Sequence, residues 1–173
     1  MIGAEKGLGT EVAMNPKQPK ITAPMLVDLL AAKHRGDVFV AECKTGPTTT
    51  ANAHHMRLDA WVMPRSWAHP DTTGYEIKVT RGDFMRDDKW PQYLKYCNYF
   101  YFVCPPNMIA VNEVPAGCGL MWASKNAAML YTKIKAPRRE VEIPENLWRY
   151  VLMCRASIQR AKCMIQKGLG EEK

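Results

Sequence analysis

Apolar residues recur along the chain with two different periods, and the change between them separates predicted helices from predicted strands. From Pro24 they recur at steps of three and four, and Gly36 is typical of the residue that ends a helix. Three segments that favour extended structure follow, and after a second helical stretch comes a nearly continuous apolar run. These predicted strands are residues 38–43, 55–62, 75–79 and 99–104. The pattern therefore predicts the order helix, three strands, helix, strand.

The second helical stretch and the C-terminal third of the chain carry further signals. Asp83 is placed to cap the second helix, and Pro91 lies inside it, which predicts a kink or two short helices. Residues 120–123 and 128–131 are weaker strand candidates. Pro144 opens a long final helix, which is predicted to be amphipathic because its apolar residues recur at steps of three and four.

The length of 173 residues suits one domain with a proper core rather than two. We expect a flexible tail over residues 1–21, a single domain over residues 22–168 and a short C-terminal tail over residues 169–173. The expected fold class is α/β, with a mixed central sheet flanked by helices and an added C-terminal helix.

Charge and composition narrow the class of partner. The chain has 24 Lys and Arg against 17 Asp and Glu, a net charge of +7, which suits a polyanion such as nucleic acid. No apolar run approaches the roughly 20 residues of a membrane span, and the first residues lack the apolar core of a secretory signal. The six cysteines are scattered and include no Cys-x-x-Cys, and His54 and His55 fit no standard zinc spacing. We therefore expect a cytoplasmic protein with reduced thiols and no membrane partner.

Asp59, Glu76 and Lys78 are the candidate chemical centre. Side chains alternate between the two faces of a strand, so Glu76 and Lys78 share a face and the residues between and beside them point to the other. Burial of a carboxylate beside an ammonium is unfavourable unless another group compensates it. A divalent cation on the carboxylates, with Lys78 on water or phosphate, would do so. The alternative is a solvated ion-pair cluster on an edge strand.

The predicted order of elements, together with these residues, resembles the PD-(D/E)XK nuclease superfamily. Within it, residues 74–106 are similar to the MmcB family of bacterial DNA-repair-associated proteins, through the segments GYEIKVTRGDF, DDKWPQYLKYC and YFYFVCPP. The segment VPAGCGLMWAS supports this resemblance, which extends over about residues 25 to 165.

The resemblance implies a role for each matching residue. Asp59 and Glu76 match the metal-binding acids, and the backbone carbonyl of Ile77 would be a further ligand of Mg2+ or Mn2+. Lys78 matches the lysine that positions water and stabilises charge on the scissile phosphate. Glu42 aligns with an extra acid seen in many members, where it would bind a second metal or polarise its water. Leu58 precedes Asp59 where the superfamily motif has proline.

Other residues are candidates for contact with DNA. In this superfamily a polar residue of the helix after the lysine often reaches the scissile phosphate, and Gln92 is the candidate, with an exposed helix residue as the alternative. Possible phosphate contacts are Arg57, Lys89 and Lys95, and also the run of Lys133, Lys135, Arg138 and Arg139, unless these are simply solvated. The aromatic residues that would either stack on bases or belong to the core are Trp90, Tyr93 and Tyr96. Asp87 and Asp88 are expected to be solvated or paired with Arg86 and Lys89.

The functional hypothesis is metal-dependent hydrolysis of DNA, in DNA repair or damage tolerance as the resemblance implies. Single-stranded, duplex and branched DNA are all open as substrates. One alternative is a DNA-binding module that keeps the fold without turnover. Another is a protein that acts through partners, with the long final helix as a docking surface or as the interface of a homodimer.

Overall fold

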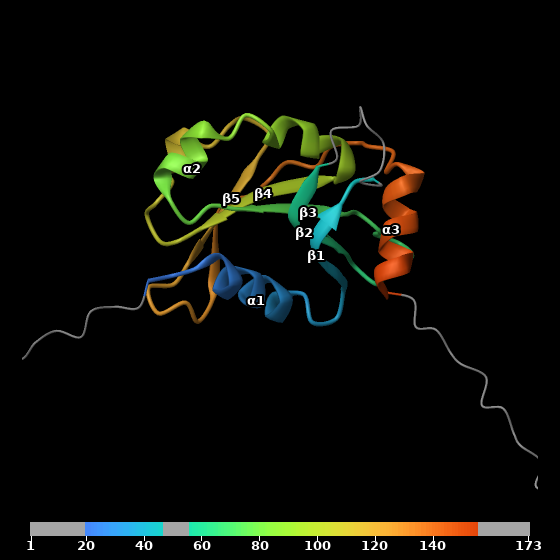
Figure 1. Cartoon of the computed structure of the whole chain (residues 1–173), viewed down its shortest axis with the longest axis horizontal. Helices are drawn as coiled ribbons and strands as arrows, with labels where there is room; N and C mark the ends of the chain where they lie inside the picture. The colour runs from blue at the N-terminus through green and yellow to red at the C-terminus, as the bar shows by residue number, and fades with distance from the viewer. Residues whose placement is uncertain (1–19, 47–55, 156–173) are drawn as a thin grey trace, which may run out of the picture.

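The computed structural model describes residues 20–46 and 56–155, which form a six-stranded sheet with helices on both faces (Figure 1). The strands are β1 (Val38–Lys44), β2 (Arg57–Met63), β3 (Thr73–Ile77), β4 (Tyr99–Cys104), β5 (Gly119–Ala123) and β6 (Leu130–Ile134). The helices are α1 (Ala23–Lys33), α2 (Arg81–Arg86) and α3 (Glu145–Arg155), with two 3-10 helices, η1 (Trp90–Tyr96) and η2 (Val111–Glu113). The predicted fold class and order of elements are confirmed.

The strands follow one another across the sheet in chain order, but their directions are mixed. β1, β2 and β3 pair antiparallel, β3, β4 and β5 pair parallel, and β6 is antiparallel to β5. As a result β3, β4 and β5 all end at one end of the sheet, where β2 and β6 begin. We call this the carboxyl end of the sheet, and loops at such an end are a common place for functional residues.

The core has two layers because β4 is buried on both faces. Phe100 and Phe102 pack on one face with η1 and α3, whereas Tyr101 and Val103 pack on the other face with α1. Figure 1 shows α1 on one side of the sheet and α2 on the other. The nearly continuous apolar run therefore forms a central strand, as the sequence predicts.

Element boundaries differ from the predicted ones where the local backbone conformation or a hydrogen bond decides the end. α1 ends at Lys33 because the backbone of His34, its C-cap, leaves the helical conformation with φ −106° and ψ 30°, so Gly36 lies two residues beyond the cap. α2 begins after Thr80, whose side-chain oxygen accepts from the Asp83 backbone N–H, so the N-cap is the threonine and not the aspartate. Two short helices, α2 and η1, replace one long one, as expected from the proline at position 91.

The ends of the chain are described in part. Ile21, which the sequence places in a tail, is buried against the α1 layer of the core. α3 begins directly after Pro144, and its predicted continuation beyond Arg155 lies outside the described residues, as do both histidines at positions 54 and 55. No described helix is long and apolar enough to cross a lipid bilayer.

The five described cysteines are free thiols, as predicted, and four of them are buried. Burial raises the pKa of Cys43 to about 12 and that of Cys104 to about 11. These thiols are therefore protonated at neutral pH and behave as small apolar core side chains.

Gly74 lies near the start of β3, the strand that carries Glu76, and the surrounding side chains leave no room for a Cβ atom there. A Cβ there would lie 2.7 Å from Leu58 Cδ2 and 2.8 Å from Cys97 Sγ. We expect Gly74→Ala to lower the free energy of unfolding by about 1–3 kcal/mol through overpacking, as measured by urea denaturation. Gly36→Ala is the matched control, because nothing lies within 4 Å of a Cβ at that position. Equal stabilities of the two variants would contradict the tight packing of β3 on its neighbours.

Candidate active site

β2 and β3 part at the carboxyl end of the sheet, and this opens the candidate site. Their last paired residues are Ala60 and Tyr75. The same register, continued by one residue, would set Asp59 opposite Glu76. Instead, Asp59 Oδ2 accepts a hydrogen bond of 2.6 Å from the Ile77 backbone N–H. The Asp59 carboxylate therefore takes the place of a strand carbonyl and lies between the two strands.

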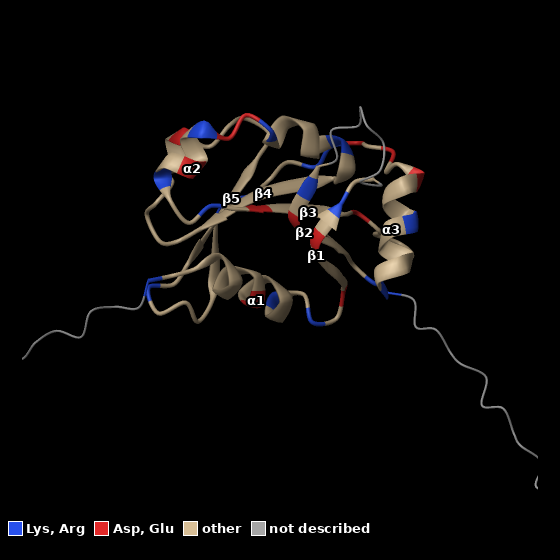
Figure 2. Cartoon of the chain, in the orientation of Figure 1, with Lys and Arg blue, Asp and Glu red and all other residues tan. Residues whose placement is uncertain are grey.

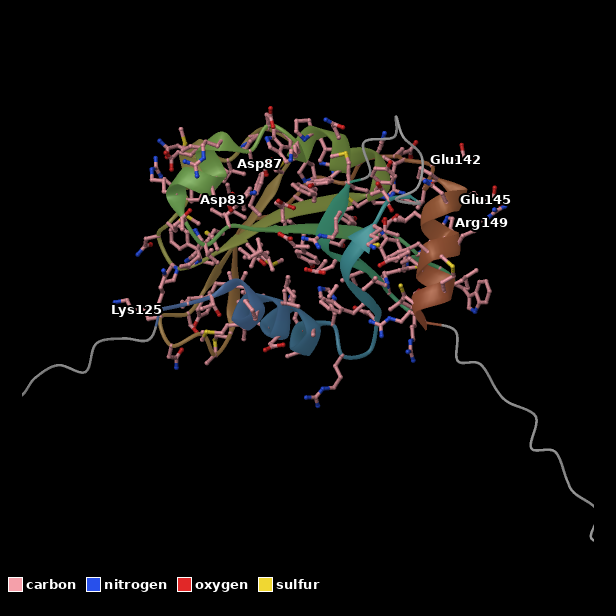
Figure 3. All side chains as sticks on the ribbon, viewed as in Figure 1. Asp83, Asp87, Lys125, Glu142, Glu145 and Arg149 are labelled. Carbon is pink, nitrogen blue, oxygen red and sulfur yellow. The ribbon has the colours of Figure 1, made fainter. Side chains whose placement is uncertain are left out.

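Glu76 and Lys78 share a face of β3, as predicted, and both are buried. Their exposed fractions are 8% and 4%. Lys78 Nζ donates to Glu76 Oε1 at 3.0 Å, lies 2.7 Å from Asp87 Oδ2 and lies 3.9 Å from Asp83 Oδ2. Figure 3 labels Asp83 and Asp87, which follow β3 in the chain on and just after α2. An exposed ion-pair cluster on an edge strand is excluded for this pair, because β3 lies between β2 and β4.

Lys78 does not fully offset the negative charge of Glu76 and Asp59, because the pKa of each of these acids is raised. Burial raises the pKa of Glu76 to about 8, and the charge of Asp59 acts in the same direction. Burial also raises the pKa of Asp59, although the hydrogen bond from the Ile77 backbone N–H acts in the opposite direction and lowers it. Burial lowers the pKa of Lys78, but contact with Asp87 and Glu76 outweighs this and raises the pKa above its ordinary value. A further cation near the two acids would stabilise their charged forms.

These side chains line a cleft of about 310 Å³ between β3, α2 and the start of η1. The buried Glu76 and the half-buried Asp59 line its β2–β3 side, and three exposed cations, Arg57, Arg86 and Lys89, are also part of its lining. Tyr93 forms one wall. Figure 2 shows basic and acidic residues interspersed along α2 and the segment after it. Such a cleft suits a cation at the two acids and a phosphate group beside the exposed basic side chains.

The donor set fits a hard divalent cation. Glu76 Oε2 is buried and has no hydrogen-bond partner among the described residues. Asp59 supplies a second carboxylate, whose charge acts on Glu76. No three His, Cys, Asp or Glu side chains of the described chain are grouped to hold a metal. Two carboxylates suffice for Mg2+, which usually keeps several waters and is completed by a phosphate oxygen.

Glu42 lies apart from Glu76 and Lys78. Its backbone has a left-handed φ of 48°, which interrupts the alternation of β1 at that residue. Its carboxylate is mostly exposed and lies 3.3 Å from Arg57 Nη1. Glu42 and Asp59 border a second hollow, of about 300 Å³, on the side of α1. The structure therefore does not bring Glu42 into the cleft that holds Asp59, Glu76 and Lys78. Ile77 also lines this second hollow rather than the cleft.

Gln92 and Lys95 are also outside the cleft, because η1 is a 3-10 helix. With three residues per turn, positions three apart lie on the same side. Tyr93 and Tyr96 take the buried side, while Gln92 and Lys95 are exposed. Lys95 Nζ lies 5.2 Å from the centre of the Tyr96 ring. Trp90 packs against the phenyl rings of β4, so the three aromatic residues of η1 belong to the core.

Asp87 is the cleft residue in contact with Lys78 that the sequence interpretation missed. It was expected to be solvated or paired with Arg86 or Lys89, but its side chain is 8% exposed and contacts Lys78. Asp87 follows the last residue of α2 in an extended conformation, which returns the chain to the cleft. The one sequence signal was that a helix must end shortly before Pro91.

A family model described as DNA repair protein MmcB-like matches residues 65–165, more than half of the chain. The chain belongs to the MmcB-like family. Within the matched segment lie Glu76, Lys78 and Asp87, whereas Asp59 precedes it. The resemblance drawn from residues 74–106 is thereby confirmed, and membership indicates a role related to DNA repair.

The fold of this MmcB-like chain recurs in a solved structure. A protein of unknown function from Silicibacter pomeroyi matches with a TM-score of 0.56 and 22% sequence identity. The match covers 79% of this chain and 84% of that one. It supports the fold alone. No curated protein matches the chain.

Proposed function

We propose that this MmcB-like protein is a metal-dependent nuclease that hydrolyses phosphodiester bonds of DNA in repair. The observation that carries the proposal is the convergence of Asp59, Glu76 and Lys78 in one cleft. Asp59 and Glu76 are 17 residues apart in the chain. They meet because each directly adjoins the last paired residues of β2 and β3, Ala60 and Tyr75. The unpartnered oxygen Glu76 Oε2 and the raised pKa of the Glu76 carboxyl support a cation there.

In this proposal Asp59, Glu76 and the backbone carbonyl of Ile77 hold Mg2+ or Mn2+. When bound, the ion supplies charge that stabilises the scissile phosphate and activates water. Lys78 orients the attacking water or binds a phosphate oxygen. A lysine ammonium has three N–H donors, and one of them is donated to Glu76 Oε1. Asp87 Oδ2 lies 2.7 Å from Nζ as a second counter-ion. The ammonium can therefore also donate to a reacting group.

The DNA backbone is held by the exposed cations of the cleft. Arg57, Arg86 and Lys89 line it and are placed to bind phosphates beside the reacting one. The net charge of +7 favours the same partner. This DNA contact is sequence-independent, because phosphates carry no sequence information.

The decisive experiment measures cleavage and metal binding together. We expect wild-type protein to cut labelled DNA with Mg2+ or Mn2+ and not with EDTA. Metal at about 100 times its Kd stabilises the folded state by about 2.7 kcal/mol, which raises Tm by several degrees. Asp59→Asn is expected to lose both effects. Glu140→Gln is the control, because the Glu140 side chain is 93% exposed.

A different result would leave the alternative function. Wild-type protein that binds DNA but cuts no substrate with any metal, and an Asp59→Asn variant that responds to metal like wild type, would contradict the nuclease proposal. The protein would then be a DNA-binding module that keeps this fold without turnover.

A further inference from the structure

A third hollow, of about 300 Å³, lies at the carboxyl end of the sheet on the side of β5 and β6. We call it the β5–β6 hollow. Its described lining carries two lysines and no acidic side chain. Its lining includes Trp122, Ser124, Lys125, Tyr131 and Lys133. None of them belongs to the candidate active site.

Two aromatic rings and a lysine form the wall of the β5–β6 hollow. Trp122 and Tyr131 are paired across β5 and β6, so their side chains share a face of the sheet. Trp122 Nε1 donates to Ile109 O at 3.1 Å, which fixes the indole. Lys133 Nζ lies 4.8 Å from the centre of the Trp122 ring and 5.8 Å from that of Tyr131. The Tyr131 side chain is 48% exposed and is therefore accessible to a ligand.

The turn between β5 and β6 is held in a defined shape, and it presents the second lysine. Ser124 Oγ accepts from the backbone N–H of Ala128 at 2.9 Å and of Met129 at 3.1 Å. Lys125 follows Ser124 directly and is exposed. Figure 3 labels Lys125 at the left edge of the view, at the level of the start of α1 and below α2.

The β5–β6 hollow and the cleft share a face and an end of the sheet. Trp122 packs with the core layer that contains Phe102, which is the layer on the side of Glu76. Neighbouring strands are about 4.8 Å apart, so three spacings from β3 to β6 separate the sites by about 14 Å. One DNA strand can therefore reach both.

We propose that the β5–β6 hollow binds an unpaired nucleotide of the DNA whose backbone occupies the cleft. The base stacks on Tyr131, and Lys125 and Lys133 neutralise the adjoining phosphates. Stacking on a protein side chain requires a base that is free of its neighbours, which a closed duplex does not offer. The inference rests on the proposed function, and it specifies the substrate as DNA with a single-stranded segment.

The test is fluorescence anisotropy of the full chain with a labelled single strand and with a blunt duplex of the same sequence, in EDTA. We expect Tyr131→Ala to raise the Kd for the single strand about 5- to 100-fold, and Tyr131→Phe to leave it within about twofold. The duplex Kd should change by less than about twofold. Lys133→Gln should lower the slope of log Kd against log salt by about 0.7.

Matched controls lie at the other end of the strands. Trp67→Ala removes an aromatic side chain that is fully exposed, and Lys33→Gln removes an exposed lysine at the end of α1. Both should bind the single strand like wild type. An unchanged Kd for Tyr131→Ala, an equal loss on duplex, an equal loss for Trp67→Ala or no binding by wild type would overturn the inference.

The results also separate this inference from the nuclease proposal. If single-strand binding depends on Tyr131 but wild type cuts no DNA in Mg2+ or Mn2+, the nuclease proposal is wrong and nucleotide binding in the β5–β6 hollow is supported. If wild type cuts DNA but single-strand binding does not depend on Tyr131, nucleotide binding in the β5–β6 hollow is wrong and the nuclease proposal is supported.

Discussion

Lys78→Met is expected to lower the single-turnover rate of DNA cleavage by at least about 100-fold while DNA affinity changes by less than about threefold. Removal of one preorganised donor from the transition state typically has an effect of this size. Methionine keeps the length of the buried stem and removes the ammonium. The affinity changes little because the exposed cations Arg57, Arg86 and Lys89 remain in the cleft.

The same substitution also removes the counter-ion of two buried acids. Glu76 and Asp87 both contact Lys78 Nζ. Removing one partner from a buried ion pair costs about 3–5 kcal/mol of folding stability, so lost activity alone could report unfolding. The double variant Lys78→Met/Asp87→Asn removes a negative charge as well. We expect it to recover part of the stability in urea denaturation and none of the cleavage.

This pair of variants separates a chemical role from a structural one. Lys33→Met, at an exposed lysine, should match wild type in both measurements. If the double variant recovers cleavage together with stability, Lys78 acts as a structural counter-ion and the water-orienting role is wrong.

The part of the site on β3 is predictable from sequence because a strand has two faces. Glu76 and Lys78 are two residues apart and must point the same way. Asp59 requires one further step, the pairing of β2 with β3, which brings it to the level of Glu76. Glu42 fails the same reasoning, because its left-handed backbone redirects a residue that an ideal strand would place differently.

The part of the site after β3 depends on the type of helix, which the sequence does not specify. Gln92 is a candidate because the resemblance places a polar residue of this helix at the scissile phosphate, with an exposed helix residue as the alternative, and the structure shows Gln92 exposed. In a 3-10 helix Tyr93 takes the cleft-facing position instead. The contact of Asp87 with Lys78 depends on the residue at which α2 ends, and helix ends are poorly predicted from local sequence.

The residues of the β5–β6 hollow could not be predicted from the sequence either, because the local sequence does not specify how β5 and β6 are paired. The sequence marks Lys133 as a possible phosphate contact. Tyr131 lies in residues 128–131, which the sequence predicts only weakly as a strand, and it was not a candidate for DNA contact. β6 pairs with β5 through a register shift between Leu120 and Met121. A shift of one residue reverses the face on which every later side chain lies. The meeting of Trp122, Tyr131 and Lys133 is therefore a property of the folded sheet.

Glu76→Gln is expected to abolish cleavage and to stabilise the metal-free protein at alkaline pH. The pKa of Glu76 is about 8 in the folded protein, against an ordinary value of 4.5. Between these values the folded state binds more protons than the unfolded state, so stability falls as the pH rises from about 4.5 toward about 8. Glutamine carries no charge at any pH and escapes this loss. Its side-chain oxygen still accepts from Lys78.

The measurement is the free energy of unfolding of both proteins in EDTA across this pH range. The stability advantage of Glu76→Gln should be near zero at about pH 4.5 and grow to about 2–4 kcal/mol at about pH 9. Glu140→Gln, at an exposed carboxylate, should show no such growth. Mg2+ should restore the wild type at high pH and leave Glu76→Gln unchanged. A constant difference across the pH range would mean that the metal-free fold already holds Glu76 charged, which would remove the electrostatic reason for a cation in the cleft.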